Sequence, residues 1–479
     1  MAKSVTLPVW AAVLLGLLAA WTLVEGILLR GARAFFLRRE EIFLRKVRTR
    51  LNLRLPAFKL IRKRRIVDRL LTDPQVLAAV DEAARSETIP AQAALRKADA
   101  YAREIVPAFH AYAYYLLGGF LGASFVRSLF RVRVGYADEP ALAGIPQDSS
   151  IVFLLNHRSN LDYILLGYLT LGRAPLSFAV GEWARVWPIK PLVTALGAYF
   201  VRRGFRDPLY RRVLSRYVQM TAEGGLIQAV FPEGRLSRDG RMGAPKLGII
   251  DYLLRGFDPA GGRDLVFIPA GVNLDRVFED RTLLLESVPG APGGAGRAFR
   301  KTASFILRNL RQMILGGWKR FGYAAINFGR PFSTRDYVRS RGIDFRGLDG
   351  PAREEAVGRL AGELMKGVAG AIPVLPVSLA ATVLVRGGPE GLEEGEFMAR
   401  ALELMGALKS AGAFVYVPRK GPEDAVRSGL RMLVLRHFAE QDEGRIRPAP
   451  SESAILSYYA NAIAHLVRKA EAKGEGGPA

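Results

Sequence analysis

The chain has 479 residues, half of them hydrophobic, which is enough for two or three domains with a sizeable core. Lysine and arginine number 69 against 45 acidic residues, and the formal net charge of +24 indicates an anionic partner such as phospholipid head groups, phosphorylated substrates or nucleic acid. Cysteine is absent and the four histidines stand in separate segments, so the composition excludes a disulfide framework, thiol chemistry and a zinc-ligand spacing.

The first predicted element is a membrane anchor. Leu7 to Leu29 is apolar except for Thr22 and Glu25. As a helix this stretch would extend about 34 Å, which exceeds the roughly 30 Å of a hydrocarbon core. A cleaved signal peptide is the alternative, although its apolar region would be shorter. We expect an uncleaved anchor.

A strongly basic stretch follows the anchor. Arg30 to Arg65 holds 14 lysines and arginines against only two acidic residues. The positive-inside rule predicts an inner-membrane protein whose remaining chain, including the catalytic domain, lies on the cytoplasmic side. Apolar residues recur within this stretch at near-helical spacing, which predicts an amphipathic helix on anionic membrane lipid. A solvated juxtamembrane helix is the alternative.

Helical composition continues to the first strand. Leu70 to Pro107 is predicted to be helical, and Asp73-Pro74 is a typical helix start. Ala111 to Val126 is apolar but only 16 residues long. It fits a core helix, an interfacial helix or a short second span, and its length argues against spanning.

The stretch from Ile151 to Leu155 reads as a buried strand that ends in a polar corner containing His157 and Asp162. An imidazole titrates close to neutral pH and can serve as a general base, and a carboxylate can fix its tautomer and stabilise the imidazolium. Residues five apart on a regular helix do not face each other, so the two meet only if the chain turns between them. The alternative is a capping histidine beside a solvated carboxylate.

Further strands are predicted at the four stretches 174–181, 197–201, 226–231 and 265–272, and Glu182 to Leu196 is expected to be helix with loop. Strands that alternate with helices predict an α/β fold with a mainly parallel sheet flanked by helices. Pro269 near the end of the last strand suggests an edge or a strand terminus. A glycine-rich loop is expected at 288–297.

Cationic side chains follow two of these strands. Arg202 and Arg203 come directly after 197–201, and guanidinium groups match phosphate oxygens, so this pair is a candidate phosphate clamp. Glu233 and Gly234 follow 226–231. The glycine permits an unusual backbone angle, whereas the glutamate could accept a hydrogen bond from a hydroxyl or hold the arginines.

Four blocks of this chain, in order, resemble the signature blocks of the glycerolipid acyltransferases with an H-x4-D motif. They are Ile151 to Tyr163, Gly197 to Arg203, Phe231 to Arg238 and Phe267 to Pro269. A run at Tyr458, Tyr459, Asn461 and His465 is similar to the C-terminal element of the membrane glycerol-3-phosphate acyltransferases. The resemblance covers about residues 66 to 467.

The resemblance implies a catalytic pair, His157 and Asp162, and two groups of binding residues. The residues implied on the substrate side are Arg202, Arg203, Glu233, Gly234, Arg235, Ser237, Arg238 and Lys246. The residues implied on the acyl-donor side are Asn156, Ile268 and Pro269, with a structural role favoured for the proline. Leu236 stands where the family pattern has an arginine, so Arg238, Arg241 and Lys246 are the alternatives for the phosphate contact at this block.

The expected reaction is acyl transfer from acyl-CoA or acyl carrier protein to the sn-1 hydroxyl of glycerol-3-phosphate, without a cofactor, structural metal or nucleic acid. Two alternatives share this chemistry, namely sn-2 acylation of lysophosphatidate and acylation of dihydroxyacetone phosphate. A basic membrane-tethered nucleic-acid binder and a catalytically inactive scaffold are alternatives of other classes.

The expected domain organisation has five parts. They are an anchor at 1–30, a basic and helical front end at 31–130, the acyltransferase domain at 131–340, a mostly helical C-terminal domain at 341–470 and a flexible tail at 471–479. Helices in the C-terminal part are predicted at 375–385, 394–411 and 424–440, and His465 is expected to be a packing residue.

Overall fold

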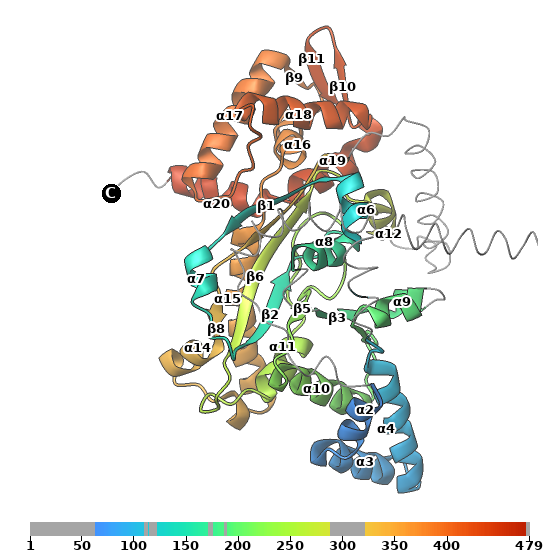
Figure 1. Ribbon diagram of the computed structural model, residues 1–479. Coiled ribbons are helices and arrows are strands. Elements are labelled where there is room, and N and C mark those ends of the chain that lie inside the picture. Colours follow the sequence, from blue (N-terminus) through green and yellow to red (C-terminus); the bar gives the residue numbers. More distant parts are fainter. Residues whose placement is uncertain are drawn as a thin grey trace, which may run out of the picture. The chain divides into compact units, whose positions relative to one another are not determined.

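The structure is a computed structural model that describes residues 63–109, 114, 122–170, 176–185, 189–287 and 321–475 (Figure 1). The predicted anchor, the basic stretch before residue 63, most of the 111–121 segment and the loop at 288–297 lie outside the described residues. Across the described part of the chain, no helix is both long and apolar enough to cross a membrane.

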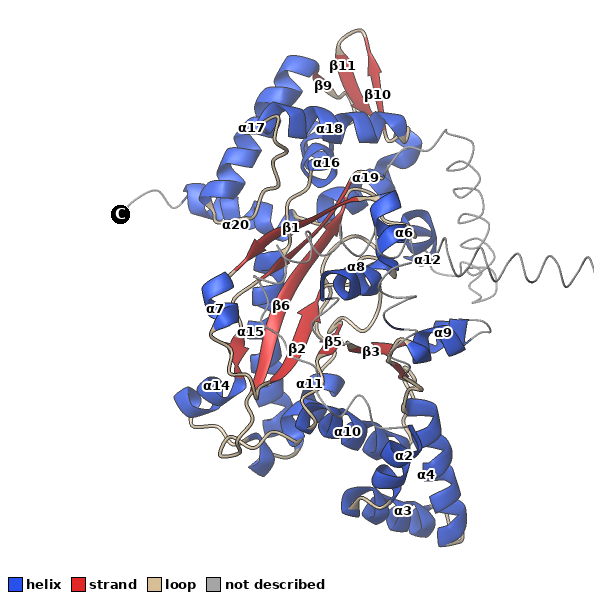
Figure 2. Ribbon diagram, viewed as in Figure 1, coloured by secondary structure: helices blue, strands red, loops and turns tan. Residues whose placement is uncertain are grey.

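An eight-stranded sheet forms the centre of the described chain, in the order β1-β7-β6-β2-β5-β3-β4, with β8 beside β6 (Figure 2). Its strands are β1 Arg131–Ala137, β2 Ser150–Leu155, β3 Ser177–Val180, β4 Ala198–Phe200, β5 Gln228–Val230, β6 Leu265–Leu274, β7 Tyr323–Phe328 and β8 Phe332–Ser333. The strands pair in parallel except where β7 and β8 run antiparallel to β6. The predicted mainly parallel α/β sheet is confirmed, while β1, β7 and β8 were not predicted.

Helices flank this sheet. They are α6 Gly122–Leu129, α7 Glu139–Ala143, α8 Leu161–Thr170, the 3-10 turn η3 Glu182–Arg185, α9 Ile189–Ala195, α10 Pro208–Glu223, α11 Gly248–Arg255, α12 Asp280–Ser287, α14 Thr334–Arg341, the 3-10 turn η4 Phe345–Gly347 and α15 Gly350–Ala371. All six residues of β2 are buried, because helices and neighbouring strands cover the sheet centre.

The front-end helices are α2 Lys63–Leu71, α3 Pro74–Ser86 and α4 Ala91–Ile105, and they pack on α10. Asp73 caps α3 by accepting a hydrogen bond from the Gln75 amide at 3.0 Å, and Pro74 occupies the first helical turn, where its missing N–H costs nothing. The predicted helix start is confirmed. Apolar residues of α2, α3 and α4 share one core with β2 and β6.

The C-terminal part is mostly helical, as predicted. It contains α16 Pro376–Gly387, α17 Glu394–Ser410, α18 Pro422–Leu435, α19 Ser453–Asn461 and α20 Ala464–Glu475, with a 3-10 turn η5 Pro450–Glu452. A small sheet was missed, with β9 Leu392–Glu393, β10 Ala439–Asp442 and β11 Arg445–Pro448 in the order β10-β11-β9. The helix predicted to reach residue 440 ends at Leu435, because the chain turns through His437 at a positive φ of 57°.

Pro269 corrects one expectation, because it lies in the middle of β6 and inside the sheet. The β6 residues before it pair with β8, and those from Ala270 onward pair with β7. The Pro269 carbonyl accepts a hydrogen bond from Gly329 on that same side. The ring nitrogen therefore faces the junction between two partner strands, where a missing N–H leaves no ladder bond unmade.

The long helix α15 lies against β6. Gly271 of β6 has no room for a side chain, since a Cβ there would approach the backbone of Ala371 and Ile372 to 2.2 Å. Leu360, Leu364 and others of α15 belong to the same core as β2. The first helix after the predicted boundary near residue 340 thus shares its packing with the central sheet.

Candidate active site

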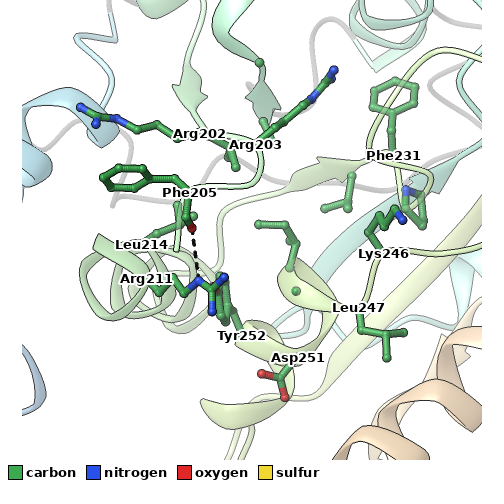
Figure 3. Close-up of a pocket in the computed structure, with 18 of the residues that line it drawn as sticks. Arg202, Arg203, Phe205, Arg211, Leu214, Phe231, Lys246, Leu247, Asp251 and Tyr252 are labelled. Carbon is green, nitrogen blue, oxygen red and sulfur yellow. Dashed lines mark hydrogen bonds between the residues drawn. The ribbon is translucent and has the colours of Figure 1, made fainter. Parts of the chain in front are cut away.

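Four parallel strands end at one edge of the sheet, and residues one to three positions after each strand line a common cavity. His157 follows β2, Gly181 follows β3 and Phe231 follows β5, while the arginine pair follows β4. The cavity has a volume of about 1010 Å³, and its other walls come from α10 and α11 (Figure 3). Carboxyl ends of parallel strands are where open α/β sheets bind ligands.

The His157 and Asp162 side chains meet, as the sequence predicted. Nδ1 of His157 lies 3.1 Å from Oδ2 of Asp162, and both side chains are buried. The same carboxylate oxygen accepts the backbone amides of Arg158 at 2.7 Å and Ser159 at 2.9 Å. The corner between β2 and α8 therefore wraps around the carboxylate, which brings together two residues that a helix would keep apart.

Aromatic rings hold the imidazole in place. The His157 ring lies 4.0 Å from the Phe231 ring and 5.5 Å from the Tyr163 ring, measured between centroids. The Tyr163 hydroxyl donates to the carbonyl of Ala179 at 2.7 Å, so this wall is fixed to β3. Sequence reasoning did not single out these two aromatics, although Phe231 opens the third block.

Glu233 is turned toward the backbone. Its Oε1 accepts the amide of His157 at 3.0 Å and its Oε2 accepts the amide of Gly243 at 2.7 Å. Burial raises the pKa of Glu233 to about 7, although the two amides oppose that rise. Neither alternative drawn from the sequence, a hydroxyl ligand or a partner for arginines, describes these contacts, since both oxygens hold backbone amides.

Glu279 holds the other side of the same corner and was missed by the sequence reasoning. Its carboxylate accepts hydrogen bonds from the Ser159 hydroxyl at 2.7 Å, the Asn160 amide at 3.2 Å and the Asn160 side chain at 3.1 Å. The residue lies directly before α12 and 119 or more positions from its partners. No local sequence pattern links segments that far apart.

The two arginines after β4 separate. Arg202 points toward α4, where it pairs with Glu104 at 2.8 and 2.5 Å, and Arg185 pairs with the same carboxylate (Figure 3). Burial alone would raise the pKa of Glu104, but hydrogen bonds and charge from the two arginines outweigh it and lower the pKa. Arg203 extends the other way, its guanidinium against Gly181. No described residue forms an ion pair with Arg203.

The cations of the third block divide in a similar way. Arg235 and Lys246 line the cavity and have no ion-pair partner among the described residues, whereas Arg238 does not line it. Gly234 adopts a positive φ of 69° that permits the turn, and Ser237 is buried, with its amide donating to the His157 carbonyl at 2.9 Å.

Further cations line the cavity from α10 and α11. Arg211 donates from Nε to the Phe205 carbonyl at 3.3 Å, drawn as the dashed line in Figure 3, and Arg255 pairs with Asp251. Arg212 also lines the cavity. Apolar side chains form much of the remaining wall. The cavity therefore combines an apolar surface with several positive charges.

The three residues expected on the acyl-donor side do not reach this cavity. The Asn156 side chain donates to the Val272 carbonyl at 2.9 Å and accepts its amide at 2.7 Å, which extends the pairing between β2 and β6. Ile268 and Pro269 are paired with β2 inside the sheet. Their predicted role therefore lacks a contact with the space beside His157.

Within the described residues, no three His, Asp or Glu side chains gather in the way that metal ligands do. His465 is partly buried, and its Nε2 lies 3.0 Å from the Ala369 carbonyl. Burial lowers its pKa. It lies in the C-terminal part, apart from the cavity lining.

Comparisons with known proteins give a consistent result. Residues 141–273 match the acyltransferase family model, and residues 309–470 match the model of the glycerol-3-phosphate acyltransferase C-terminal region. The chain is 28% identical over 423 residues to a glycerol-3-phosphate acyltransferase of Pseudomonas fluorescens strain SBW25, and 30% identical over 419 residues to one of Pseudomonas aeruginosa strain UCBPP-PA14. Each match covers 84% of this chain and 48% of the relative, so the chain spans about half the length of these curated relatives.

One solved structure, the 1-acyl-sn-glycerophosphate acyltransferase PlsC of Thermotoga maritima, matches with 17% identity and a TM-score of 0.27, covering 51% of this chain and 75% of that one. The fold described above rests on this chain's own strands and not on that likeness. The chain therefore contains a region that matches the acyltransferase family model, followed by a region that matches the glycerol-3-phosphate acyltransferase C-terminal model, and it is similar to curated glycerol-3-phosphate acyltransferases over 84% of its length.

Proposed function

We propose that the protein transfers an acyl group from acyl-CoA or an acyl carrier protein to the sn-1 hydroxyl of glycerol-3-phosphate. The observation that carries the proposal is the contact between His157 Nδ1 and Asp162 Oδ2 at a cavity lined by cations that have no ion-pair partner among the described residues. The named activity of the relatives supports this acceptor.

His157 is the proposed general base. Asp162 engages Nδ1, which leaves Nε2 to take the proton of the acceptor hydroxyl. The hydroxyl oxygen attacks the thioester carbonyl, a C–O bond forms, the C–S bond breaks, and the imidazolium returns the proton to the departing thiolate. The apolar wall around Phe231 and Tyr163 excludes water, whose attack on the thioester is the competing reaction.

The substrate phosphate is assigned to Arg203, Arg235 and Lys246. These three cations line the cavity and have no carboxylate partner among the described residues. Arg202 is not assigned to the phosphate, because its Nε and Nη2 already donate to the two carboxylate oxygens of Glu104. Glu233, Gly234 and Ser237 shape the backbone around the base, while Arg238 stays a predicted contact.

The location follows from the sequence expectations. We assign Leu7 to Leu29 as an anchor in the inner membrane, with the catalytic domain at the cytoplasmic face and the adjoining basic stretch on anionic lipid. We also propose the domain boundaries expected from the sequence, near residues 30, 130, 340 and 470. Protease digestion of intact and inverted vesicles tests it, since only inverted vesicles should expose the catalytic domain.

An acceptor and donor panel tests the reaction. The full chain in nanodiscs of anionic phospholipid receives glycerol-3-phosphate, lysophosphatidate or dihydroxyacetone phosphate, each with palmitoyl-CoA or palmitoylated acyl carrier protein. We expect 1-acyl lysophosphatidate only when glycerol-3-phosphate is the acceptor. The His157→Ala variant is expected to give no product while its circular dichroism spectrum is unchanged. Preferred use of another acceptor, or a folded and fully active His157→Ala variant, contradicts the proposal.

A further inference from the structure

The Tyr-Tyr element at the C-terminal end has no part in the reaction as described so far. It lies on α19, remote in sequence from the catalytic corner. Its first tyrosine nevertheless contacts that corner through Arg158, the residue that follows the proposed base.

Arg158 is a buried cation with few hydrogen-bond partners. Its residue is 3% exposed and its Nη1 donates to the Gly240 carbonyl at 2.8 Å, whereas Nε and Nη2 have no partner among the described residues. A buried charge is costly unless another group compensates it. The guanidinium carbon lies 4.7 Å from the centroid of the Tyr458 ring, within the range of a cation–π interaction.

Tyr458 contacts Arg158 through the face of its ring and not through its hydroxyl group. The side chain is fully buried, and its hydroxyl has no hydrogen-bond partner among the described residues. A buried hydroxyl without a partner contributes nothing favourable, so a hydrogen bond does not account for a tyrosine here. The cation–π contact between the ring face and Arg158 accounts for an aromatic residue at this position.

The backbone of α19 packs closely against the two residues that follow the third block, Asp239 and Gly240. Gly240 has a φ of 87°, and a Cβ on it would lie 1.9 Å from the Tyr458 carbonyl oxygen. Asn461 donates from Nδ2 to the Asp239 carbonyl at 2.9 Å. Arg158, Gly240 and α19 therefore form one packed unit.

The second tyrosine reaches the corner by another route. The Tyr459 hydroxyl donates to Asp280 at 2.6 Å and accepts the Val277 amide at 3.0 Å, and Arg436 pairs with the same aspartate. Asp280 adjoins Glu279, whose carboxylate holds Ser159 and Asn160. Both tyrosines thus support the residues between the base and its carboxylate.

We propose that Tyr458 is a positioning residue for the His157–Asp162 pair. The Arg158 amide donates to the same Asp162 oxygen that contacts the imidazole, so movement of the arginine moves the carboxylate. The C-terminal region then takes part in acyl transfer by fixing the angle between base and carboxylate. This inference rests on the proposed function and adds a residue to its machinery.

The test compares Tyr458→Leu with wild type in full-length protein, using glycerol-3-phosphate and palmitoyl-CoA. We expect kcat to fall by about 10- to 100-fold, because a misplacement of about 1 Å at a catalytic group has an effect of that order. KM for glycerol-3-phosphate is expected to stay within about twofold, since the proposed phosphate ligands are on other segments. Tyr458→Phe, which keeps the ring, is expected to recover kcat.

Tyr337→Leu is the matched control. Tyr337 is also a buried tyrosine under an arginine, with the Arg341 guanidinium 5.4 Å from its ring, but it lies on α14 away from the cavity. It is expected to lose stability without the selective fall in kcat. An equal fall in kcat in both leucine variants overturns the proposal, as does failure of Tyr458→Phe to recover activity.

A double-mutant cycle adds a second readout. The effects of Arg158→Met and Tyr458→Leu on kcat are expected to be strongly non-additive, because each removes the same contact. Additive effects contradict the coupling. Wild-type protein without acyl transfer would refute the proposed function, whereas active wild type with unchanged Tyr458→Leu would refute this inference alone.

Discussion

Glu233 accepts the backbone amide of His157 at 3.0 Å, although 76 positions separate the two residues in the chain. The same carboxylate accepts the amide of Gly243, so one side chain ties the base to the loop that carries the third block. The position of the imidazole therefore depends on a residue that need not contact substrate.

Glu233→Gln tests this tie. A carboxamide has one acceptor oxygen, so one of the two amides must face its NH2 group. We expect the free energy of unfolding to fall by about 1–3 kcal/mol and kcat to fall with it. Urea denaturation and initial rates measure both, with Glu363→Gln at the exposed Arg341 pair as a control that should stay within about 0.5 kcal/mol.

Asp162→Asn separates charge from shape in the catalytic pair. The asparagine can still accept an amide of the corner, but it cannot stabilise a positively charged imidazole as a carboxylate does. We expect kcat to fall by roughly 10²- to 10⁴-fold with little change in KM. Steady-state kinetics on the folded variant decide the matter, and a loss below threefold would show that the carboxylate is not needed.

The arginines after β4 should behave differently despite being neighbours. Arg203→Ala removes a cavity cation, and we expect KM for glycerol-3-phosphate to rise about 10- to 100-fold, as loss of a charge-assisted hydrogen bond would cause. Arg202→Ala leaves Glu104 short of a partner, so a stability loss of about 1–3 kcal/mol is expected with a small change in KM. Titration of the acceptor and urea denaturation measure both quantities, and equal KM effects would contradict the assignment.

Asp275 should make stability depend on pH. Burial raises its pKa to about 7, although the amides of Tyr323 and Val377 that donate to it oppose the rise. The folded state then binds a proton more tightly than the unfolded chain, so this contribution is full below about pH 4 and is lost as pH rises through about 7. The loss amounts to at most roughly 4 kcal/mol.

Asp275→Asn removes that titration. Urea denaturation between pH 4 and 8 should show wild-type stability falling relative to the variant across this window, and then a constant difference above about pH 7.5. The asparagine also weakens one of the two amide contacts, but that effect is independent of pH. Parallel curves for the two proteins across the window would contradict the raised pKa.

Local patterns predicted the elements that carry the site, and distant contacts explain what they missed. The buried strand before His157 is predicted by a run of apolar residues, and the turn to Asp162 is predicted by the polar residues that follow this run. The pairing of Arg202 with Glu104 joins segments 98 positions apart, so the sequence could not separate the two arginines. Short strands such as β8, with two residues, contain too little periodicity to detect.

The expectation for Pro269 failed for a related reason. Its position inside the sheet depends on β7 and β8 meeting at one point beside β6. No sequence pattern near Pro269 predicts that arrangement. Asn156 was placed on the donor side by family likeness, but its amide group is used by Val272. Residue type alone did not distinguish a ligand from a backbone partner.

The pairing of Arg202 with Glu104 has a consequence for any truncation of this protein. Glu104 belongs to the front-end helices, which look dispensable because they precede every strand. A truncated protein that began at β1 would lose this carboxylate and unmask a guanidinium at the rim of the cavity, beside the proposed phosphate ligands. The added positive charge would change how such a truncation binds its acceptor. The front end therefore serves to neutralise the charge of Arg202 beside the cavity.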